Sequence, residues 1–141
     1  MKNPIKLALA FIAACSLSTA CKKENQGVPY VPVNITMYVT DPQFVNLNAV
    51  GGWVYITGGY RGILLYRKSQ TEFAAYERAC TFDPENTDEY VKMDANNIEA
   101  VDSHCGSRFL ITDGSVTQGP AGVPLKTYQT HFDGTVLTIY N

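Results

Sequence analysis

Alternation of apolar and polar residues with a period of two is the feature that most constrains this 141-residue chain. In residues 33–39 every second residue is apolar, so these side chains would share one face of a strand. Two runs rich in β-branched and aromatic residues, 53–57 and 63–66, follow. The glycine-rich segment 58–62 between them predicts a hairpin. The pattern therefore predicts strands joined by tight turns.

Similar short runs continue to the end of the chain, at the spacing typical of sandwiches and barrels. They cover residues 90–93, 98–101, 109–112, 115–116, 125–130 and 135–140. Asp113-Gly114 predicts a tight turn, and residues 132–134 predict a terminal hairpin. Ser69 and Glu72 have capping-box spacing, which favours a helix before residue 78. The chain is 45% hydrophobic and 17% charged, which is typical of one globular domain, and the expected fold class is all-β.

The first 20 residues have the pattern of a secretory signal peptide. Lys2 and Lys6 form a basic start, residues 7–14 are apolar, and residues 18–20 are small. The apolar run is too short to span a bilayer. Because Cys21 directly follows the small residues, the segment resembles the lipobox of bacterial lipoproteins, in which such a cysteine carries lipid.

Cys15 is the alternative lipid anchor. Its preceding residues, Ile12-Ala13-Ala14, match the usual lipobox sequence better, but an anchor at Cys15 leaves an apolar region of only residues 7–14. Cys21 is followed by the polar segment 22–26, which is typical of a mature lipoprotein. We therefore expect Cys21 to be lipidated, with a cleaved, soluble secreted protein as the other possibility.

A chain that starts at Cys21 lacks Lys2 and Lys6, so 9 basic residues face 13 acidic ones, a net charge of −4. This balance excludes nucleic acid as an expected partner, because no basic surplus is present to neutralise phosphates. Residues 21–32 contain two prolines and little apolar content, which predicts a tether. We expect a bacterial cell-envelope protein, an outer-membrane or surface lipoprotein facing the periplasm or the exterior. Its partners would be the membrane, through lipid, and an unidentified envelope protein or ligand.

The second half of the chain contains a specific set of motifs. They are His104-Cys105-Gly106-Ser107-Arg108-Phe109, Asp113-Gly114, Gly119-Pro120-Ala121 and Pro124-Leu125-Lys126-Thr127-Tyr128. In order and spacing these resemble the Rieske iron–sulfur domain, whose second cluster loop reads Cys-x-x-His-Gly-Ser-x-Phe and whose covering loop reads Gly-Pro-Ala-x-x-Pro-Leu. Cys80-Thr81-Phe82 lies where the family has its first loop, Cys-x-His.

The resemblance extends from about residue 51 to the end. It implies that residues 33–141 form a Rieske-like antiparallel β-sandwich or barrel with a small cluster-binding subdomain. The former cluster loops would lie at about residues 80–85 and 102–109, and the covering loop at 119–125. It also implies that residues 73–78, before the first loop, form a strand rather than a helix.

The ligands of the family are mostly missing. The four ligand positions carry Cys80, Phe82, Asp102 and Cys105, where a Rieske cluster needs two thiolates and two neutral imidazoles. Phe82 has no lone pair to donate, and Asp102 offers a hard oxygen where a soft sulfur is required. We therefore expect these to be vestigial positions in a domain that has lost its [2Fe–2S] cluster and has no cofactor. A retained [2Fe–2S] cluster or a zinc ion is the alternative.

In the family the two cluster loops approach each other, which implies that Cys80 and Cys105 lie close together. An exported protein meets an oxidising environment, so we predict a Cys80–Cys105 disulfide. In the chain-entropy model, closing a loop of about 25 residues stabilises the fold by about 3.5 kcal/mol. A redox-active dithiol is an alternative. Another is a zinc site made of Cys80, His104, Cys105 and either Asp102 or Asp83, although neighbouring residues in a strand point to opposite sides.

We find no nucleophile paired with a base by a known signature, so we expect no enzyme activity. The acidic run 83–89 predicts a solvated linker, and His131 is expected at the surface. The expected function is a non-catalytic binding or structural module at the cell envelope. A metal-binding or iron–sulfur electron-transfer protein and a dithiol redox module remain as alternatives.

Overall fold

A computed structural model of the chain describes residues 27–141. The signal peptide, Cys15 and Cys21 lie outside the described residues, so the predictions made for them stay predictions. Within residues 27–141 no helix is long and apolar enough to cross a membrane. The strands are β1 (Asn34–Tyr38), β2 (Trp53–Ile56), β3 (Ile63–Arg67), β4 (Phe73–Glu77), β5 (Lys92–Met93), β6 (Glu99–Val101), β7 (Arg108–Leu110), β8 (Val116–Gln118), β9 (Thr127–Phe132) and β10 (Val136–Tyr140).

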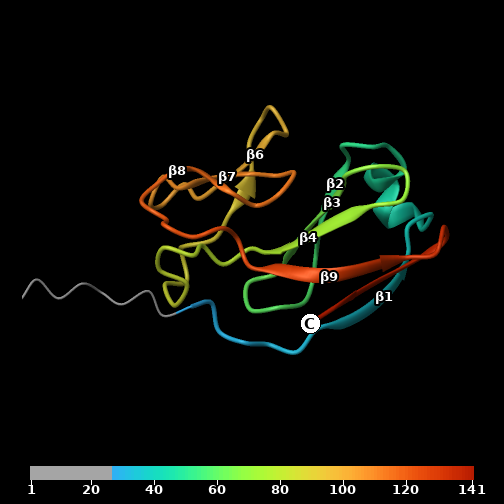
Figure 1. The fold of residues 1–141 in the computed structure, drawn as a ribbon, viewed down its shortest axis with the longest axis horizontal. Coiled ribbons are helices and arrows are strands. Elements are labelled where there is room, and N and C mark those ends of the chain that lie inside the picture. The colour runs from blue at the N-terminus through green and yellow to red at the C-terminus, as the bar shows by residue number, and fades with distance from the viewer. Residues whose placement is uncertain (1–26) are drawn as a thin grey trace, which may run out of the picture.

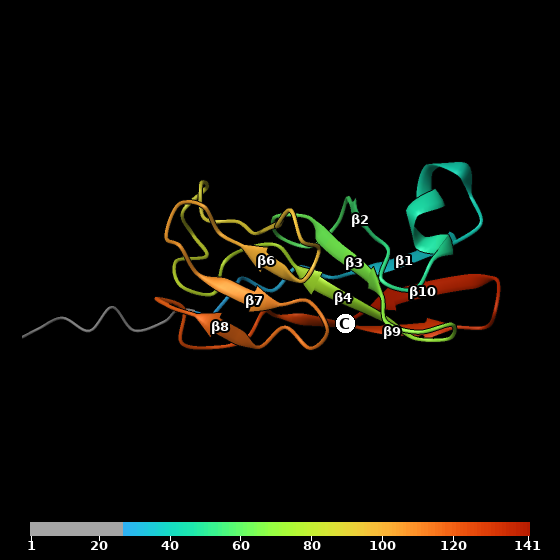
Figure 2. The ribbon, with the colours of Figure 1, turned by 90° about the horizontal axis from the view of Figure 1, so that it is seen from above.

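The strands form two antiparallel sheets, which confirms the all-β prediction. A larger, six-stranded sheet has the order β1-β10-β9-β4-β3-β2, and a smaller, four-stranded sheet has the order β5-β6-β7-β8. Figures 1 and 2 show the small sheet at one end of the molecule and strands β1, β9 and β10 at the other. The predicted hairpins are present, since β2 pairs with β3 and β9 pairs with β10.

Strand β3 is buried on both faces. Ile63 and Leu65 pack into one hydrophobic core with β1 and β10, whereas Leu64 packs into a second core beneath the small sheet. The unbroken apolar run of β3 follows from this position, because a strand covered on both faces has no polar side. The second core also contains Cys80 and Phe109, so the two sequence segments that resemble cluster loops meet there.

The structure also contains a short 3-10 helix, η1 (Pro42–Asn48), which the period-two pattern does not predict. Asp41 caps it by accepting a hydrogen bond from the Gln43 amide, and Pro42 suits its first turn. Leu47 from this helix is fully buried in the larger core. The helix lies at the end of the molecule opposite the segments that carry Cys80 and Cys105 (Figure 1).

Candidate metal centre

The first loop of the site leaves β4 and returns antiparallel to it. Ala79 forms a β-bridge with Tyr90, and the Cys80 amide donates a hydrogen bond to the Glu89 carbonyl at 3.0 Å. Both ends of the loop are therefore held together. Because Glu89 precedes buried Val91 by two residues, its side chain points to the same inner side.

The buried Glu77 carboxylate fixes the approach to this loop. It accepts hydrogen bonds from the amides of Tyr60, Arg61 and Ala79 at 2.6–3.0 Å. The Tyr128 hydroxyl donates a fourth at 2.6 Å. One buried side chain thus ties β9 and the β2–β3 turn to the residue before Cys80.

The second loop, between β6 and β7, is a tight turn. The Asp102 amide donates to the Ser107 carbonyl and the Gly106 amide to the Asp102 carbonyl, each at 2.9 Å. Gly106 has φ +83°, a left-handed conformation that favours glycine. One carboxylate oxygen of Asp102 accepts from the His104 amide at 2.8 Å. The turn therefore fixes Asp102 and places Cys105 beside it.

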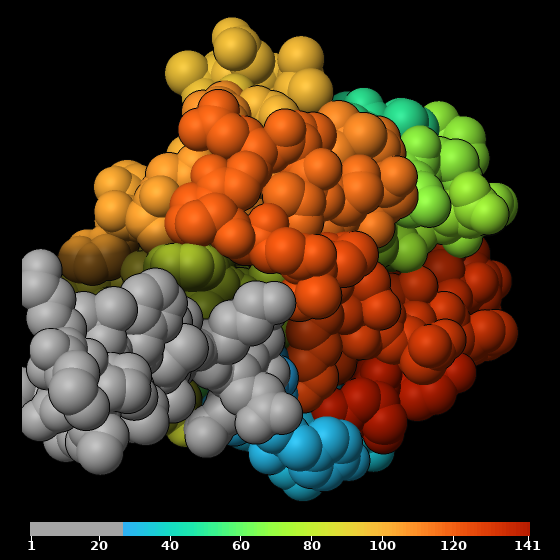
Figure 3. All heavy atoms as spheres, turned by 60° about the vertical axis from the view of Figure 1, so that its left-hand side comes forward, coloured from blue at the N-terminus to red at the C-terminus, as the bar shows by residue number. Residues whose placement is uncertain are grey.

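The third loop, residues 119–125, covers the other two. The Ala121 amide donates to the Ser107 hydroxyl at 3.0 Å, and the Thr81 hydroxyl donates to the Val123 carbonyl at 2.7 Å. Figure 3 shows this loop, in orange, beside the olive segment that follows Cys80. These two hydrogen bonds join residues 119–125 to both of the other loops.

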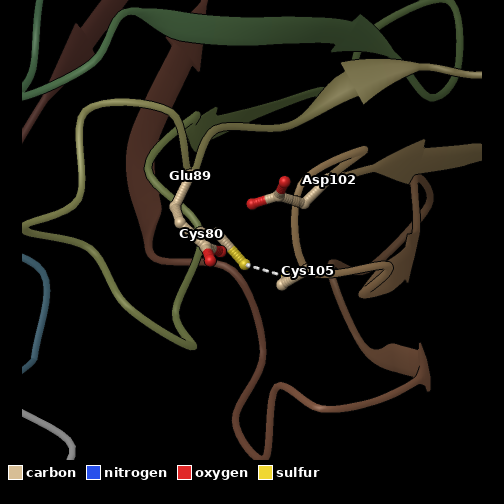
Figure 4. Close-up of side chains that lie close together, drawn as sticks. All are labelled: Cys80, Glu89, Asp102 and Cys105. Carbon is tan, nitrogen blue, oxygen red and sulfur yellow. Dashed lines mark hydrogen bonds between the residues drawn. The ribbon is translucent and has the colours of Figure 1, made fainter.

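Four potential metal ligands converge where the loops meet. One ligand atom from each of Cys80, Glu89, Asp102 and Cys105 lies within 4.8 Å of the other three (Figure 4). Cys80 and Asp102 are fully buried, Glu89 is 3% exposed and Cys105 is partly exposed. Two sulfurs and two carboxylates are a donor set that a metal ion can bind.

Two buried oxygens of this cluster lack hydrogen-bond partners. They are Oε2 of Glu89 and Oδ2 of Asp102. Neither carboxylate forms an ion pair with a basic side chain among residues 27–141. Leaving a buried polar atom without a partner costs about 1–3 kcal/mol, and more for a charged group. The two oxygens therefore point to a positively charged ligand that both could bind.

The protonation of the cluster reflects this surplus of acidic groups. Burial raises the pKa of the Glu89 carboxyl, and the negative charge of the neighbouring Asp102 raises it further. Burial also raises the pKa of both the Cys80 and the Cys105 thiols. Each shift favours the protonated, uncharged form, which a bound cation would oppose.

The two thiols are close but not bonded. Cys80 Sγ and Cys105 Sγ lie 3.7 Å apart, and both cysteines are free. Bonded sulfurs lie about 2.05 Å apart. The Cys105 thiol also donates to the Ser107 hydroxyl at 3.1 Å, which orients it. The structure thus brings the two sulfurs together, as the resemblance implies, while the disulfide itself stays a prediction.

Three of the four positions that correspond to the family's ligands hold residues of this cluster, and the fourth does not. Cys80, Asp102 and Cys105 belong to the cluster, whereas Phe82, whose side chain offers no metal-binding atom, is 40% exposed. His104, an alternative zinc ligand, is exposed, and neither His104 nor Asp83 belongs to the cluster. His131 is exposed, as predicted.

Glu89 is the site residue that sequence reasoning missed. The expectation of a solvated linker over 83–89 is wrong at its last residue, because Glu89 is buried. The sequence pattern contained a signal for this residue. Val91 lies in the strand predicted over residues 90–93, and period-two alternation extended backward places residue 89 on the same face as Val91.

The comparisons with known proteins come from structure alone. No protein-family profile matches the chain, and no curated protein matches its sequence. One similar structure is the cyanobacterial plasma membrane Rieske protein PetC3 from Synechocystis PCC 6803, with a TM-score of 0.51 and 21% identity. The match covers 77% of this chain and 98% of that protein.

Two ferredoxin structures are similar as well. The ferredoxin of carbazole 1,9a-dioxygenase from Nocardioides aromaticivorans IC177 has a TM-score of 0.50 and 16% identity, over 78% of this chain and 97% of that one. A complex of reduced oxygenase and oxidized ferredoxin in carbazole 1,9a-dioxygenase matches with a TM-score of 0.50 and 18% identity, over 76% and 93%. The chain therefore has the Rieske-like fold that its motifs predict.

One expectation is wrong: that the domain has no cofactor. Its fold is shared with a Rieske protein and with ferredoxins, and the same region holds four converging donors that could bind a metal ion. Glu89, one of the four donors, lies outside the family's ligand positions, so the missing ligands at those positions do not exclude a metal. The donor set nevertheless differs from the Rieske set, because it contains carboxylates and no imidazole.

Proposed function

We propose that this protein is a metal-binding domain of the cell envelope that holds one divalent ion of the zinc class between Cys80, Glu89, Asp102 and Cys105. The observation that carries the proposal is the pair of buried carboxylate oxygens without partners, on Glu89 and Asp102, aimed at the same space as the two thiols. One cation would satisfy both oxygens and replace the thiol protons.

The sulfur geometry supports a single tetrahedral ion. With metal–sulfur bonds of about 2.3 Å, two thiolates on tetrahedral zinc lie about 3.8 Å apart. The Cys80 and Cys105 sulfurs lie 3.7 Å apart. The thiols therefore need almost no movement to bind, and one oxygen of each carboxylate lies within 4.8 Å of both sulfurs.

The donor chemistry favours this ion over a two-iron cluster. A Rieske cluster uses two neutral imidazoles on one iron, and His104 is exposed outside the cluster of donors. Zinc, a borderline-soft ion, binds sulfur and carboxylate oxygen together. We propose that a mononuclear site stands in the place of the [2Fe–2S] cluster.

The remaining parts of the proposal rest on the sequence. We propose that Cys21 carries lipid, that residues 22–32 tether the domain, and that the protein acts without catalysis, as a binding module at a bacterial envelope. Its partner there would be an envelope protein or ligand, not nucleic acid, because the net charge from Cys21 onward is negative.

Metal content tests the proposed function. The full-length chain, purified in detergent under reducing conditions and freed of metal, is titrated with Zn²⁺ and separately with Co²⁺. We expect one ion per chain and, with cobalt, the visible absorption of a tetrahedral thiolate complex. Asp88→Asn is the matched control, because Asp88 is exposed and adjacent to Glu89. Two irons per chain with iron–sulfur absorption, or no binding of either ion, would overturn the proposal.

A further inference from the structure

We infer that the same two thiols make this a redox-gated metal site: a small-molecule disulfide oxidises Cys80 and Cys105 to a disulfide, and the ion is released. The inference rests on the proposed function, because it assigns a control to that site. It begins from the two sulfurs, which lie 3.7 Å apart on loops 25 residues apart in sequence. Forming the bond requires the sulfurs to approach by about 1.7 Å.

The two thiols differ in their access to solvent. Cys80 is fully buried beneath the small sheet, whereas Cys105 is partly exposed. Cys105 lies in the turn between Asp102 and Ser107, whose residues Ser103 and His104 are exposed. An oxidant from solvent therefore reaches Cys105 first, and Cys80 is placed to complete the reaction from the inside.

The reaction balances in two exchange steps. The Cys105 thiolate attacks a sulfur of a disulfide R–S–S–R, forms a mixed disulfide and releases one R–S⁻. The Cys80 thiolate then attacks Cys105 Sγ, forms the Cys80–Cys105 bond and releases the second R–S⁻. The protein pair loses two electrons and the reagent gains two. The released thiolates take protons from water.

The turn that carries Cys105 can make this movement. It is held by two backbone hydrogen bonds at Asp102, by the His104 amide on the Asp102 carboxylate and by the Gln118 side chain on the Gly106 carbonyl. None of these bonds involves the amide or the carbonyl of Cys105. The contact that orients the sulfur is the hydrogen bond to Ser107, which breaks when the thiol is oxidised. Gly106, directly after Cys105, has no atom within 4 Å of its Cβ position, so the turn has free space on that side.

Oxidation removes the stronger half of the donor set. Only Glu89 and Asp102 remain, and two carboxylates are fewer than the three or four ligands of a protein zinc site. Zinc affinity should fall by more than about 100-fold, since changes outside the ligand shell already cost 10–100-fold. Reduction restores both thiols and with them the site.

The test uses the full-length chain loaded with one Zn²⁺ and treated with glutathione disulfide, with reduced glutathione as the control reagent. A zinc-sensitive dye reports release, and peptide mapping of the alkylated protein locates disulfides. We expect one zinc released per Cys80–Cys105 disulfide and rebinding after reduction. Peptide mapping matters because Cys15 and Cys21 could also react.

The outcomes separate this inference from the proposed function. If the reduced protein binds no zinc, the proposed function fails and the gate with it. If zinc stays bound after the Cys80–Cys105 disulfide forms, the gate is wrong and the metal site stands. Zinc release without that disulfide also overturns the gate. In Cys105→Ser, glutathione disulfide should no longer change the amount of bound zinc, whatever the starting affinity.

Discussion

The amide of Cys80 and the carbonyl of Glu89 are hydrogen-bonded at 3.0 Å, so the backbone holds these two potential metal ligands of the first loop opposite each other. Their side chains therefore face the same space without help from a ligand. Such preorganisation means that metal binding orders little chain and retains most of its free energy as affinity.

Glu89→Gln should weaken zinc binding by at least about tenfold, because it removes a charged donor from the site. Asp88→Asn, which changes the exposed neighbouring carboxylate, should leave the affinity unchanged. Competition with a zinc-chelating dye measures both variants. Equal affinities in the two variants would remove Glu89 from the set of ligands.

Removing the metal should lower stability. An ion that binds only the folded state stabilises it by about 4 kcal/mol when free metal exceeds Kd 1,000-fold. We expect urea unfolding of the reduced protein to shift to lower urea when a chelator is added. Asp102→Asn should lose most of this shift, because the buried oxygen without a partner belongs to the carboxylate that it replaces. A chelator effect of the same size in Asp102→Asn would argue against this site.

Glu77→Ala should destabilise the domain by about 3–5 kcal/mol, because it leaves several buried donors without an acceptor. The affected groups are three amides and the Tyr128 hydroxyl. Glu85→Gln, at an exposed position in the first loop, serves as the control. Urea unfolding measures both, and a loss below about 1 kcal/mol in Glu77→Ala would show that water replaces the carboxylate.

Acid should weaken the small sheet through Glu99. Hydrogen bonds from Thr117 and Arg108 lower the pKa of Glu99 below its ordinary 4.5. A depressed pKa in the folded state gives stability that is present above the unfolded pKa and is lost as pH falls through the folded one. The urea midpoint should therefore fall more steeply below pH 4.5 in the native protein than in Glu99→Gln. Parallel curves would contradict this role.

The metal-free disulfide form should be more stable than the metal-free dithiol form. The chain-entropy model gives about 3.5 kcal/mol for a loop of this length. Guanidinium unfolding of the oxidised and reduced proteins, both in chelator, measures the difference. A less stable oxidised form would show that the bond strains the turn at Cys105.

The strands could be predicted from sequence because burial in this fold follows the pleat. Period-two alternation predicts β1, and the apolar run of β3 predicts a strand covered on both faces. The helix η1 could not be predicted in this way, because its single buried residue, Leu47, leaves no periodic pattern.

The candidate site was only partly predictable. The motif around Cys105 and the position of Cys80 indicate where the loops meet, and both belong to the cluster of donors. Glu89 was missed because an acidic run normally indicates solvent, whereas the bridge between Ala79 and Tyr90 turns this one side chain inward. Tertiary pairing of two distant segments decides such a position, and local composition does not report it.

Strand β3 has a consequence for how the molecule unfolds. Leu64 faces the core of the small sheet while Leu65, the next residue, faces the core of the large one, so neither core can open without exposing the same strand. The two halves should therefore melt in one cooperative transition. Metal bound beside the small sheet would then make the β9–β10 hairpin, at the other end of the molecule, more resistant to proteolysis.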